Sequence, residues 1–388
     1  MSNKNLTILG VVTVLMVIWA AIQSRVSSRP RTEPGALSYL ILGLDTTDIG
    51  GIVLGTGKDA VTMKRKGRHF LIANKDNYPA VTSKISELIT SCLDIKTAEL
   101  YTDESAYHED LEVTEEKAQS VVKFMTPEPN STVLAGVVVG KAKELGEGTY
   151  VRLVSSDKAS SDKVYVTSNV PRIKNQAIDY IEQELISVNR EDINSVTVSS
   201  PSGEYTLKPK EGSKDIVLEN IPAGKKAKSS ECDRVFTASA NLRFDDVTKK
   251  SSDLTFDRRF VCKLNDSTVY TLEIAQKDGK TYVGCQAEYT GEVPTKDMTK
   301  VESPEVLKEK EAKLLALDNV RLFSTKHQDW VYEMAEWKAK DLTMGLSELI
   351  ENEEKPEEVK QTEEPNSAGV MQLLSPGGRL SAEPNSVK

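Results

Sequence analysis

An internal repeat constrains the fold of this 388-residue chain more than any other feature of its sequence. The segments Asp48–Lys64 and Asp192–Lys208 align at a constant offset of 144 residues, with apolar residues at matching positions such as Ile52 and Val196. Each segment reads as two alternating strands joined by a Gly-containing turn, the pattern of a β-hairpin. A repeated hairpin indicates that the sheet around it is repeated too.

The repeat continues beyond the hairpins. Ile85–Leu100 aligns with Cys232–Val247 at an offset of 147 residues, and in each segment the residues at i, i+3, i+4 and i+7 fall on one helix face. Further alternating strands follow each helix. A hairpin, a helix and a meander predict an antiparallel sheet with a helix on one face. The expected fold class is α+β, with two repeated units of antiparallel sheet and packed helix, preceded by one N-terminal transmembrane helix.

The same patterns set the expected domain boundaries. The first repeat is predicted over residues 37–172 and the second over residues 189–350, the latter with a closing helical segment that begins at Pro304. Between them, the apolar spacing of Gln176–Ile186 predicts a connector helix over residues 173–188. Residues 351–388 carry eight acidic and four basic residues and no aromatic residue. Such a composition predicts a disordered acidic tail.

The N-terminal region has the composition of a membrane span. Leu6–Ile22 is a run of 17 residues without a charge, and as a helix it would be about 25 Å long, close to the thickness of a hydrocarbon core. We expect residues 1–26 to form an uncleaved anchor and residues 27–36 a linker. A cleaved signal peptide is the alternative. The arginines within residues 25–31 favour a cytoplasmic body, whereas the short N-terminus favours an extracytoplasmic one, which we adopt.

Composition also restricts the function. The net charge of −9 argues against a nucleic-acid partner, because such proteins carry a basic surplus. The three histidines, His69, His108 and His327, are far apart without the paired spacing of metal ligands, and we interpret them as surface residues. The sequence thus predicts no catalytic residue, no metal ligand and no cofactor-binding residue.

Two local patterns approach catalytic motifs without meeting them. The Gly-rich stretch Leu42–Lys58 lacks both the first glycine and the final Ser or Thr of a phosphate-binding P-loop. Asp45 and Asp48 precede the first hairpin, and because Asp192 recurs at the second, we interpret them as turn and strand-entry residues.

The four cysteines form no Cys-x-x-Cys pair. Cys92 and Cys232 lie on or beside the apolar faces of the two predicted helices, where a cysteine acts as a small hydrophobic residue. Cys262 and Cys285 fall on the first and third strands of a three-strand run. They could form a disulfide only if the order of strands in the sheet brought those two together.

The segment order resembles a known bacterial envelope family. Leu44–Leu54, Val61–Ile72, Tyr78–Leu100 and Thr149–Ser168 follow the N-terminal apolar run in the order typical of the domain of unknown function 4340 family. The stretch from His108 to Val121 departs from the Gly-Leu-Asp-Asp-Pro-like turn of that family. The resemblance implies a single-span protein with an extracytoplasmic domain, often linked to gliding-motility-type ABC transporter auxiliary components. It supplies no enzymatic residue.

We therefore expect a non-enzymatic, membrane-anchored extracytoplasmic interaction module, accessory to an ABC-type transport or envelope complex. Its partners would be the membrane, through the N-terminal helix, and protein subunits of that complex. Its location would be the bacterial inner (cytoplasmic) membrane, with the soluble domain periplasmic. An extracytoplasmic solute- or glycan-binding protein is the alternative, and an envelope enzyme with an unrecognised site is a third hypothesis.

Overall fold

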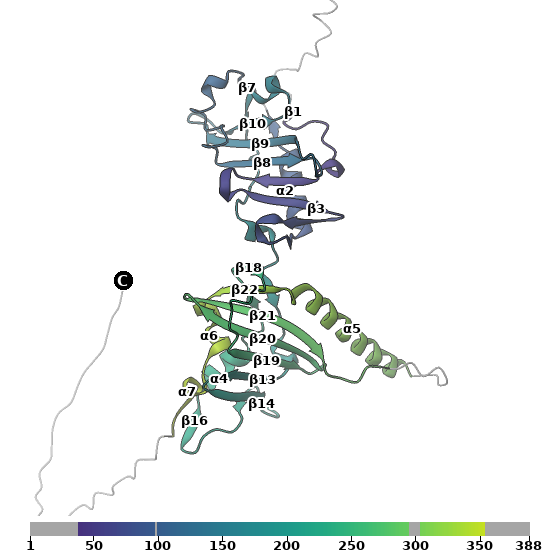
Figure 1. Cartoon of the computed structure of the whole chain (residues 1–388), viewed down its shortest axis with the longest axis vertical. Coiled ribbons are helices and arrows are strands. Elements are labelled where there is room, and N and C mark those ends of the chain that lie inside the picture. The colour runs from purple at the N-terminus through teal and green to yellow at the C-terminus, as the bar shows by residue number, and fades with distance from the viewer. Residues whose placement is uncertain (1–37, 98, 295–302, 354–388) are drawn as a thin grey trace, which may run out of the picture.

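The computed structural model describes residues 38–97, 99–294 and 303–353. The predicted anchor and linker, and the predicted tail from residue 354 onward, lie outside these residues. None of the helices within these ranges is both long and apolar enough to cross a membrane. The chain forms a first lobe (residues 38–172) and a second lobe (residues 184–353), stacked along the long axis of the molecule (Figure 1).

The first lobe is built on an open antiparallel sheet whose strand order interleaves both ends of the unit. Neighbouring strands run β5 (Tyr78–Pro79), β4 (His69–Ile72), β3 (Val61–Lys66), β2 (Gly51–Leu54), β8 (Ser120–Met125), β9 (Val133–Ala142), β10 (Thr149–Val154), β11 (Val164–Thr167) and β7 (Glu99–Thr102). A two-stranded sheet joins β1 (Ser38–Tyr39) to β6 (Lys96–Thr97). Helix α2 (Thr82–Leu93) packs on the core, and α3 (Lys158–Ser161) connects β10 to β11.

The second lobe repeats this order. Its neighbouring strands run β15 (Ile216–Leu218), β14 (Gly203–Pro209), β13 (Ile193–Ser200), β19 (Arg258–Leu264), β20 (Thr268–Lys277), β21 (Lys280–Tyr289), β22 (Trp330–Ala335) and β18 (Asp246–Lys249). A two-stranded sheet again precedes the main one, here from β12 (Glu184–Ile186) and β17 (Leu242–Arg243). Helix α4 (Ser229–Phe236) stands where α2 stands in the first lobe.

Short helical turns mark the strand entries. The 3₁₀ helices are η1 (Thr46–Asp48), η2 (Gly57–Asp59), η3 (Ala73–Lys75), η4 (Ser105–Tyr107), η5 (Ala177–Tyr180) and η6 (Arg190–Asp192). η1 and η6 precede the first hairpin strand of their lobes at the same offset as the sequence repeat. Asp45 accepts hydrogen bonds from the backbone N and the hydroxyl of Thr47 at 2.8 and 2.7 Å. These bonds lower the pKa of its carboxyl group, so Asp45 is a turn residue, as predicted.

The register of the two hairpins follows the sequence offset. Ile52 pairs with Met63 in the first lobe, and Val196 pairs with Leu207 in the second. All four side chains are buried, because strand alternation turns them towards the same core. The α+β class is confirmed, and each lobe contains an antiparallel sheet with a helix packed on it.

The helix faces also correspond. Ile85, Leu88, Ile89 and Cys92 are the buried residues of α2, and Cys232, Val235 and Phe236 are those of α4. The fourth position of the second set, Ser239, is buried just beyond the end of α4. The predicted apolar faces therefore point into the core in both lobes.

The predicted connector helix over residues 173–188 is wrong. The segment Gln176–Ile186 makes one 3₁₀ turn, η5, and then extends as β12. β12 pairs with β17 across 58 intervening positions of sequence, from Glu184 to Arg243. This long-range pairing overrides the helical spacing, so the second lobe begins at Glu184 rather than at residue 189.

The predicted closing helical segment is only partly helical. α5 (Pro304–His327), α6 (Glu336–Thr343) and α7 (Leu346–Leu349) are helices, but β22 between α5 and α6 is a strand inside the sheet that pairs with β21 and β18. α5 connects β21 to β22, the place that the four-residue α3 occupies in the first lobe. β23 (Ile350–Asn352) pairs with β16 (Lys225–Ala227), so the first two residues of the predicted tail belong to a strand.

The lobes meet through opposite sheet edges. Lys75, next to β5, forms an ion pair of 2.6 Å with Asp246 in β18. Tyr78 in β5 packs edge-on against Trp330 in β22, with 4.8 Å between ring centroids, and its hydroxyl lies 3.5 Å from that of Tyr332. The β5 edge of the first lobe thus covers the β18 edge of the second.

Candidate functional site

The histidines lie in different environments. His69 is exposed, as predicted. The prediction of a surface position is wrong for His108 and His327, which are both buried. The Nε2 atom of His108 is hydrogen-bonded to the carbonyl of Asp162 at 2.9 Å, and Nδ1 of His327 shares a hydrogen bond with the Tyr332 hydroxyl. Burial lowers the pKa of His327 to about 3, so its ring is neutral at physiological pH.

The cysteines are buried thiols. Cys262 lies on β19 and Cys285 on β21, and β20 separates these strands, so the sheet order does not bring the two together. Burial raises the pKa of Cys92 to about 12 and that of Cys262 to about 11, and it also raises the pKa of Cys232 and Cys285. A thiol held protonated in this way is a poor nucleophile and a poor metal ligand. In the described parts of the chain, no three His, Cys, Asp or Glu side chains gather to form a metal site.

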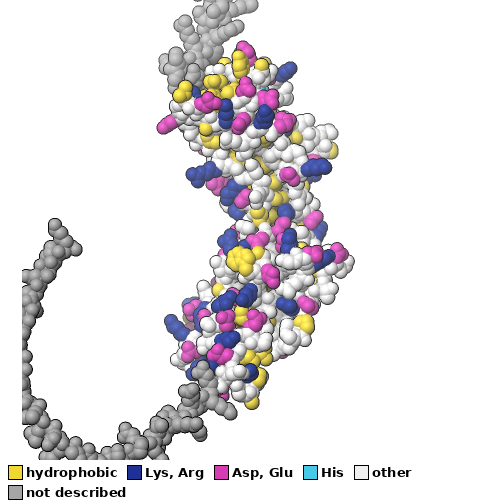
Figure 2. Space-filling model, turned by 90° about the vertical axis from the view of Figure 1, so that its left-hand side faces the viewer, with side chains coloured by type: hydrophobic (Ala, Val, Ile, Leu, Met, Phe, Trp, Pro, Cys, Tyr) yellow, Lys and Arg dark blue, Asp and Glu magenta, His cyan; other side chains and the backbone are white. Residues whose placement is uncertain are grey.

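An exposed apolar surface lies at the end of the first lobe farthest from the second lobe (Figure 1). Its large hydrophobic side chains are on or next to β1, β7 and η4, and we call them the outer edge: Tyr39, Leu42, Leu100, Tyr101 and Tyr107. In Figure 2, hydrophobic side chains reach the surface at the top of this lobe among charged side chains of both signs. Scattered single apolar residues are ordinary, but Leu100 and Tyr101 lie on β7, the strand that ends the main sheet, where exposed apolar side chains are a candidate contact surface.

Local packing holds the outer edge in place. Tyr101, which is half exposed, packs on Tyr150 with 4.7 Å between ring centroids. Burial raises the pKa of Tyr150 to about 12, so its phenol stays neutral. The ammonium group of Lys96 lies 5.5 Å from the ring centroid of Tyr39. These contacts place the rings of Tyr101 and Tyr39 against neighbouring side chains.

The internal repeat allows the outer edge to be compared with the corresponding strand of the second lobe. The outer edge is built around β7, and β18 is its equivalent in the second lobe. Leu100 pairs with Tyr165 on β11 as Val247 pairs with Tyr332 on β22. In the second lobe this edge is covered by Tyr78 and Lys75 of the first lobe. Leu100 is thus exposed where its counterpart Val247 is buried, whereas Thr248, the counterpart of Tyr101, is exposed like Tyr101.

Part of the chain matches the model of a known family. Residues 71–259 match the model of a family described as a domain of unknown function (DUF4340). Over these residues the chain is a domain of this family. The DUF4340 match begins in β4 and ends in β19, so it takes in parts of both sheets and the segment that connects them, while Trp330 and Tyr332 of the junction lie beyond it. No curated protein and no solved structure matches the chain.

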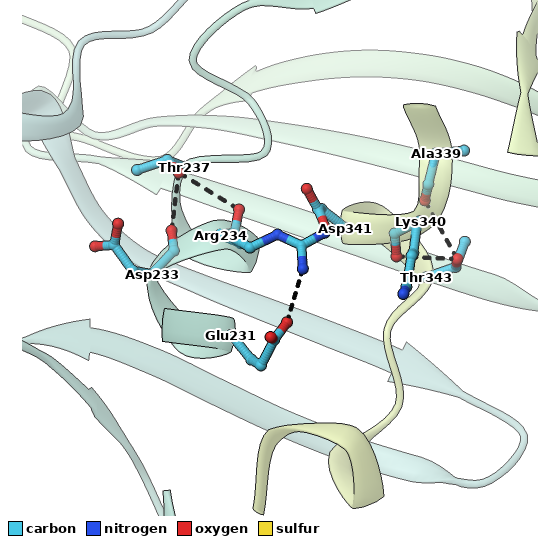
Figure 3. Close-up of polar contacts among 8 residues, drawn as sticks. All are labelled: Glu231, Asp233, Arg234, Thr237, Ala339, Lys340, Asp341 and Thr343. Carbon is cyan, nitrogen blue, oxygen red and sulfur yellow. Dashed lines mark hydrogen bonds and ion pairs between the residues drawn. The ribbon is translucent and has the colours of Figure 1, made fainter. Parts of the chain in front are cut away.

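Structure beyond the DUF4340 match belongs to the same second lobe. Arg234 on α4 lies between Glu231, at 2.9 Å, and Asp341 on α6, at 2.6 Å (Figure 3). This bridge fixes α6, which follows the matched residues, against α4, which lies within them. The sequence pattern does not reveal the outer edge, because the exposure of Leu100 and Tyr101 depends on which strand ends the sheet.

Proposed function

We propose that the chain is a membrane-anchored, extracytoplasmic interaction module that binds a protein subunit of an ABC-type transport or envelope complex through its outer edge. The observation that carries the proposal is the exposed outer edge around β7, since β18, the corresponding strand of the second lobe, contacts the first lobe through Asp246. Exposed tyrosines and leucines are suited to a protein contact, because aromatic anchors supply most of the affinity at interfaces.

The position of the outer edge supports a partner within the membrane. Ser38, the first described residue, belongs to β1, so the apolar run Leu6–Ile22 is joined to the chain at this end. A partner that spans the membrane beside the anchor would meet the outer edge first. The link to ABC transporter auxiliary components that the family resemblance implies agrees with such a partner.

The second lobe argues against a further copy of this chain as the partner. A further copy would have to offer the surface that β5 offers within the chain. In the second lobe, β16 stands in the place of β5 and pairs with β23. Lys225 occupies the position of Tyr78. The second lobe therefore has no tyrosine there to repeat the contact that Tyr78 makes with β22. We therefore propose a different protein as the partner.

Co-purification with outer-edge variants tests the proposal. The full chain, solubilised from its native membrane in mild detergent, should retain a transport or envelope subunit. Leu42→Glu and Tyr101→Glu should each lower its recovery about tenfold or more, the effect of losing roughly 1.4 kcal/mol of binding free energy. Leu322→Glu is the matched control, because Leu322 is an exposed leucine on α5, outside the outer edge.

The variants separate the competing functions. Equal recovery of the subunit with all three variants, or a chain that runs alone in mild detergent, would contradict the proposal. The alternative of glycan binding also has support, because three of the outer-edge residues are tyrosines, which stack on sugar rings. Under that alternative, Tyr101→Glu would abolish binding to a glycan array while leaving protein recovery unchanged.

A further inference from the structure

A small groove in the first lobe has an apolar floor and a rim that carries two arginines. It lies between α2 and the β3–β4 hairpin and has a volume of about 230 Å³. Its floor is apolar, formed by Phe70, Ile85 and Ile89, which are buried. Its rim carries Arg65, Arg68 and a series of hydroxyl groups from α2. The volume is below the range of about 300–1,000 Å³ that holds small-molecule ligands, and it suits a single side chain.

The equivalent space in the second lobe is filled by the chain itself. Arg190, at the start of η6, forms an ion pair with Asp233 on α4. Its guanidinium lies 5.9 Å from the ring centroid of Phe236 and donates a hydrogen bond of 2.8 Å to the carbonyl of Lys214. A charged side chain thus occupies the groove, with its charge paired on the helix wall.

The first lobe lacks both members of that pair. At the repeat offsets, Thr46 stands in the place of Arg190 and Ser86 in the place of Asp233. Both residues line the open groove. The charge of the walls is also reversed, because Arg65 takes the position of Pro209 on the hairpin wall. The first-lobe groove is therefore open and lined by arginines, whereas the equivalent space in the second lobe is filled by the Arg190 side chain.

The two arginines have unused capacity for an anion. The guanidinium of Arg65 donates hydrogen bonds to the carbonyls of Thr47 and Thr46, at 2.8 and 3.2 Å, and lies 5.1 Å from the ring centroid of Phe70. Within the described residues, no carboxylate lies at ion-pair distance from Arg65 or Arg68. The nearby Asp45 carboxylate is engaged by Thr47. Guanidinium groups bind carboxylates with two parallel hydrogen bonds, so this rim favours one.

We propose that the first-lobe groove binds the carboxylate side chain of a Glu- or Asp-bearing segment of a partner protein. The carboxylate would meet Arg68 and Arg65 at the rim, hydroxyl groups of α2 would donate to its free oxygens, and the aliphatic stem would lie on the apolar floor. This is the charge inverse of the contact that Arg190 makes in the second lobe. The proposal is independent of the outer edge, which is a separate surface.

Peptide binding to the full chain in detergent tests the proposal. The probe is a fluorescent peptide of alternating Leu and Glu, and its matched control replaces each Glu by Gln. The Glu peptide should bind at least tenfold more tightly than the Gln peptide, and Arg68→Gln should weaken binding about tenfold. The double variant T46R/S86D installs the second-lobe pair and should abolish binding. Lys66→Gln, which removes an exposed charge outside the groove, should leave it unchanged.

Several results would overturn the proposal. Equal affinity for the Glu and Gln peptides would exclude a carboxylate site, and undiminished binding by T46R/S86D would place the contact elsewhere. Equal losses from Lys66→Gln and Arg68→Gln would mean general charge attraction. A synthetic peptide of residues 351–364 that displaced the probe at far lower concentration would assign the groove to the chain's own acidic tail. Unchanged melting temperatures of the variants show that the fold is intact.

Discussion

Replacing His327 by glutamine should flatten the acid dependence of the stability of the fold. His327 ends α5 and is 2% exposed. Its ring packs against Phe323, with 4.4 Å between centroids, and its Nδ1 shares a hydrogen bond with Tyr332. Burial and the neighbouring Lys326 lower the pKa of His327 from 6.5 to about 3. Glutamine can keep a hydrogen bond to Tyr332 but does not titrate.

The sign follows from proton binding. Between pH 6.5 and pH 3 the unfolded chain protonates this histidine and the folded chain does not, so the free energy of unfolding decreases as the pH falls. Each pH unit within this window costs about 1.4 kcal/mol. From pH 7 to pH 5, His327 should therefore account for about 2 kcal/mol of lost stability. Above pH 6.5 both states are neutral, and the contribution is constant.

Urea denaturation at pH 7, 6 and 5 measures this term. The difference in unfolding free energy between the native chain and His327→Gln should change by about 2 kcal/mol over this range, in favour of the variant at low pH. Other acid-labile groups act equally in both proteins, so they cancel in the difference. If the two stability curves ran parallel from pH 7 to pH 5, His327 would titrate normally and the buried, neutral ring would be refuted.

Three further predictions address the core and the junction. The four cysteines should not react with a thiol reagent at pH 8 until the chain is unfolded, because burial raises their pKa; rapid colour from the native protein would contradict this. Gly50→Ala should destabilise the first lobe by about 2 kcal/mol or more in urea denaturation, since its Cβ would lie 2.3 Å from the Cα of Pro127; an unchanged midpoint would refute the close packing. A double-mutant cycle with Lys75→Met and Asp246→Asn should give a coupling of about 1 kcal/mol, because the pair is partly shielded from solvent; zero coupling would remove this ion pair from the junction.

Much of each lobe could be predicted because its signals are local. The alternation of apolar residues around Ile52 and Val196 predicts which strand faces are buried. The spacing that begins at Ile85 and Cys232 does the same for the helices. These residues are buried, as expected. The repeat strengthened both predictions, since two unrelated stretches seldom share an offset. Asp45 was interpretable for the same reason, because capping of a turn depends on residues two positions away.

What could not be predicted depends on contacts distant in sequence. The segment ending at Ile186 has helical spacing, but pairing with Leu242 makes it a strand. The sequence of β22 is part of the predicted helical segment. Its pairing with β21 and β18 makes it a strand instead. The hydrogen bond of buried His108 is likewise to a remote residue, Asp162. The outer edge and the first-lobe groove are exposed because no other part of the described chain covers them. The sequence alone does not show which surfaces are covered.

Site-directed photo-crosslinking in native membranes tests the central claim most directly. A benzophenone amino acid placed at Tyr101 should form an adduct with a multi-span subunit of a transport or envelope complex, identified by mass spectrometry. The same group at Leu322, on the exposed face of α5, should not form that adduct. Adducts with lipid alone at Tyr101, or the same protein adduct from both positions, would contradict a partner bound at the outer edge.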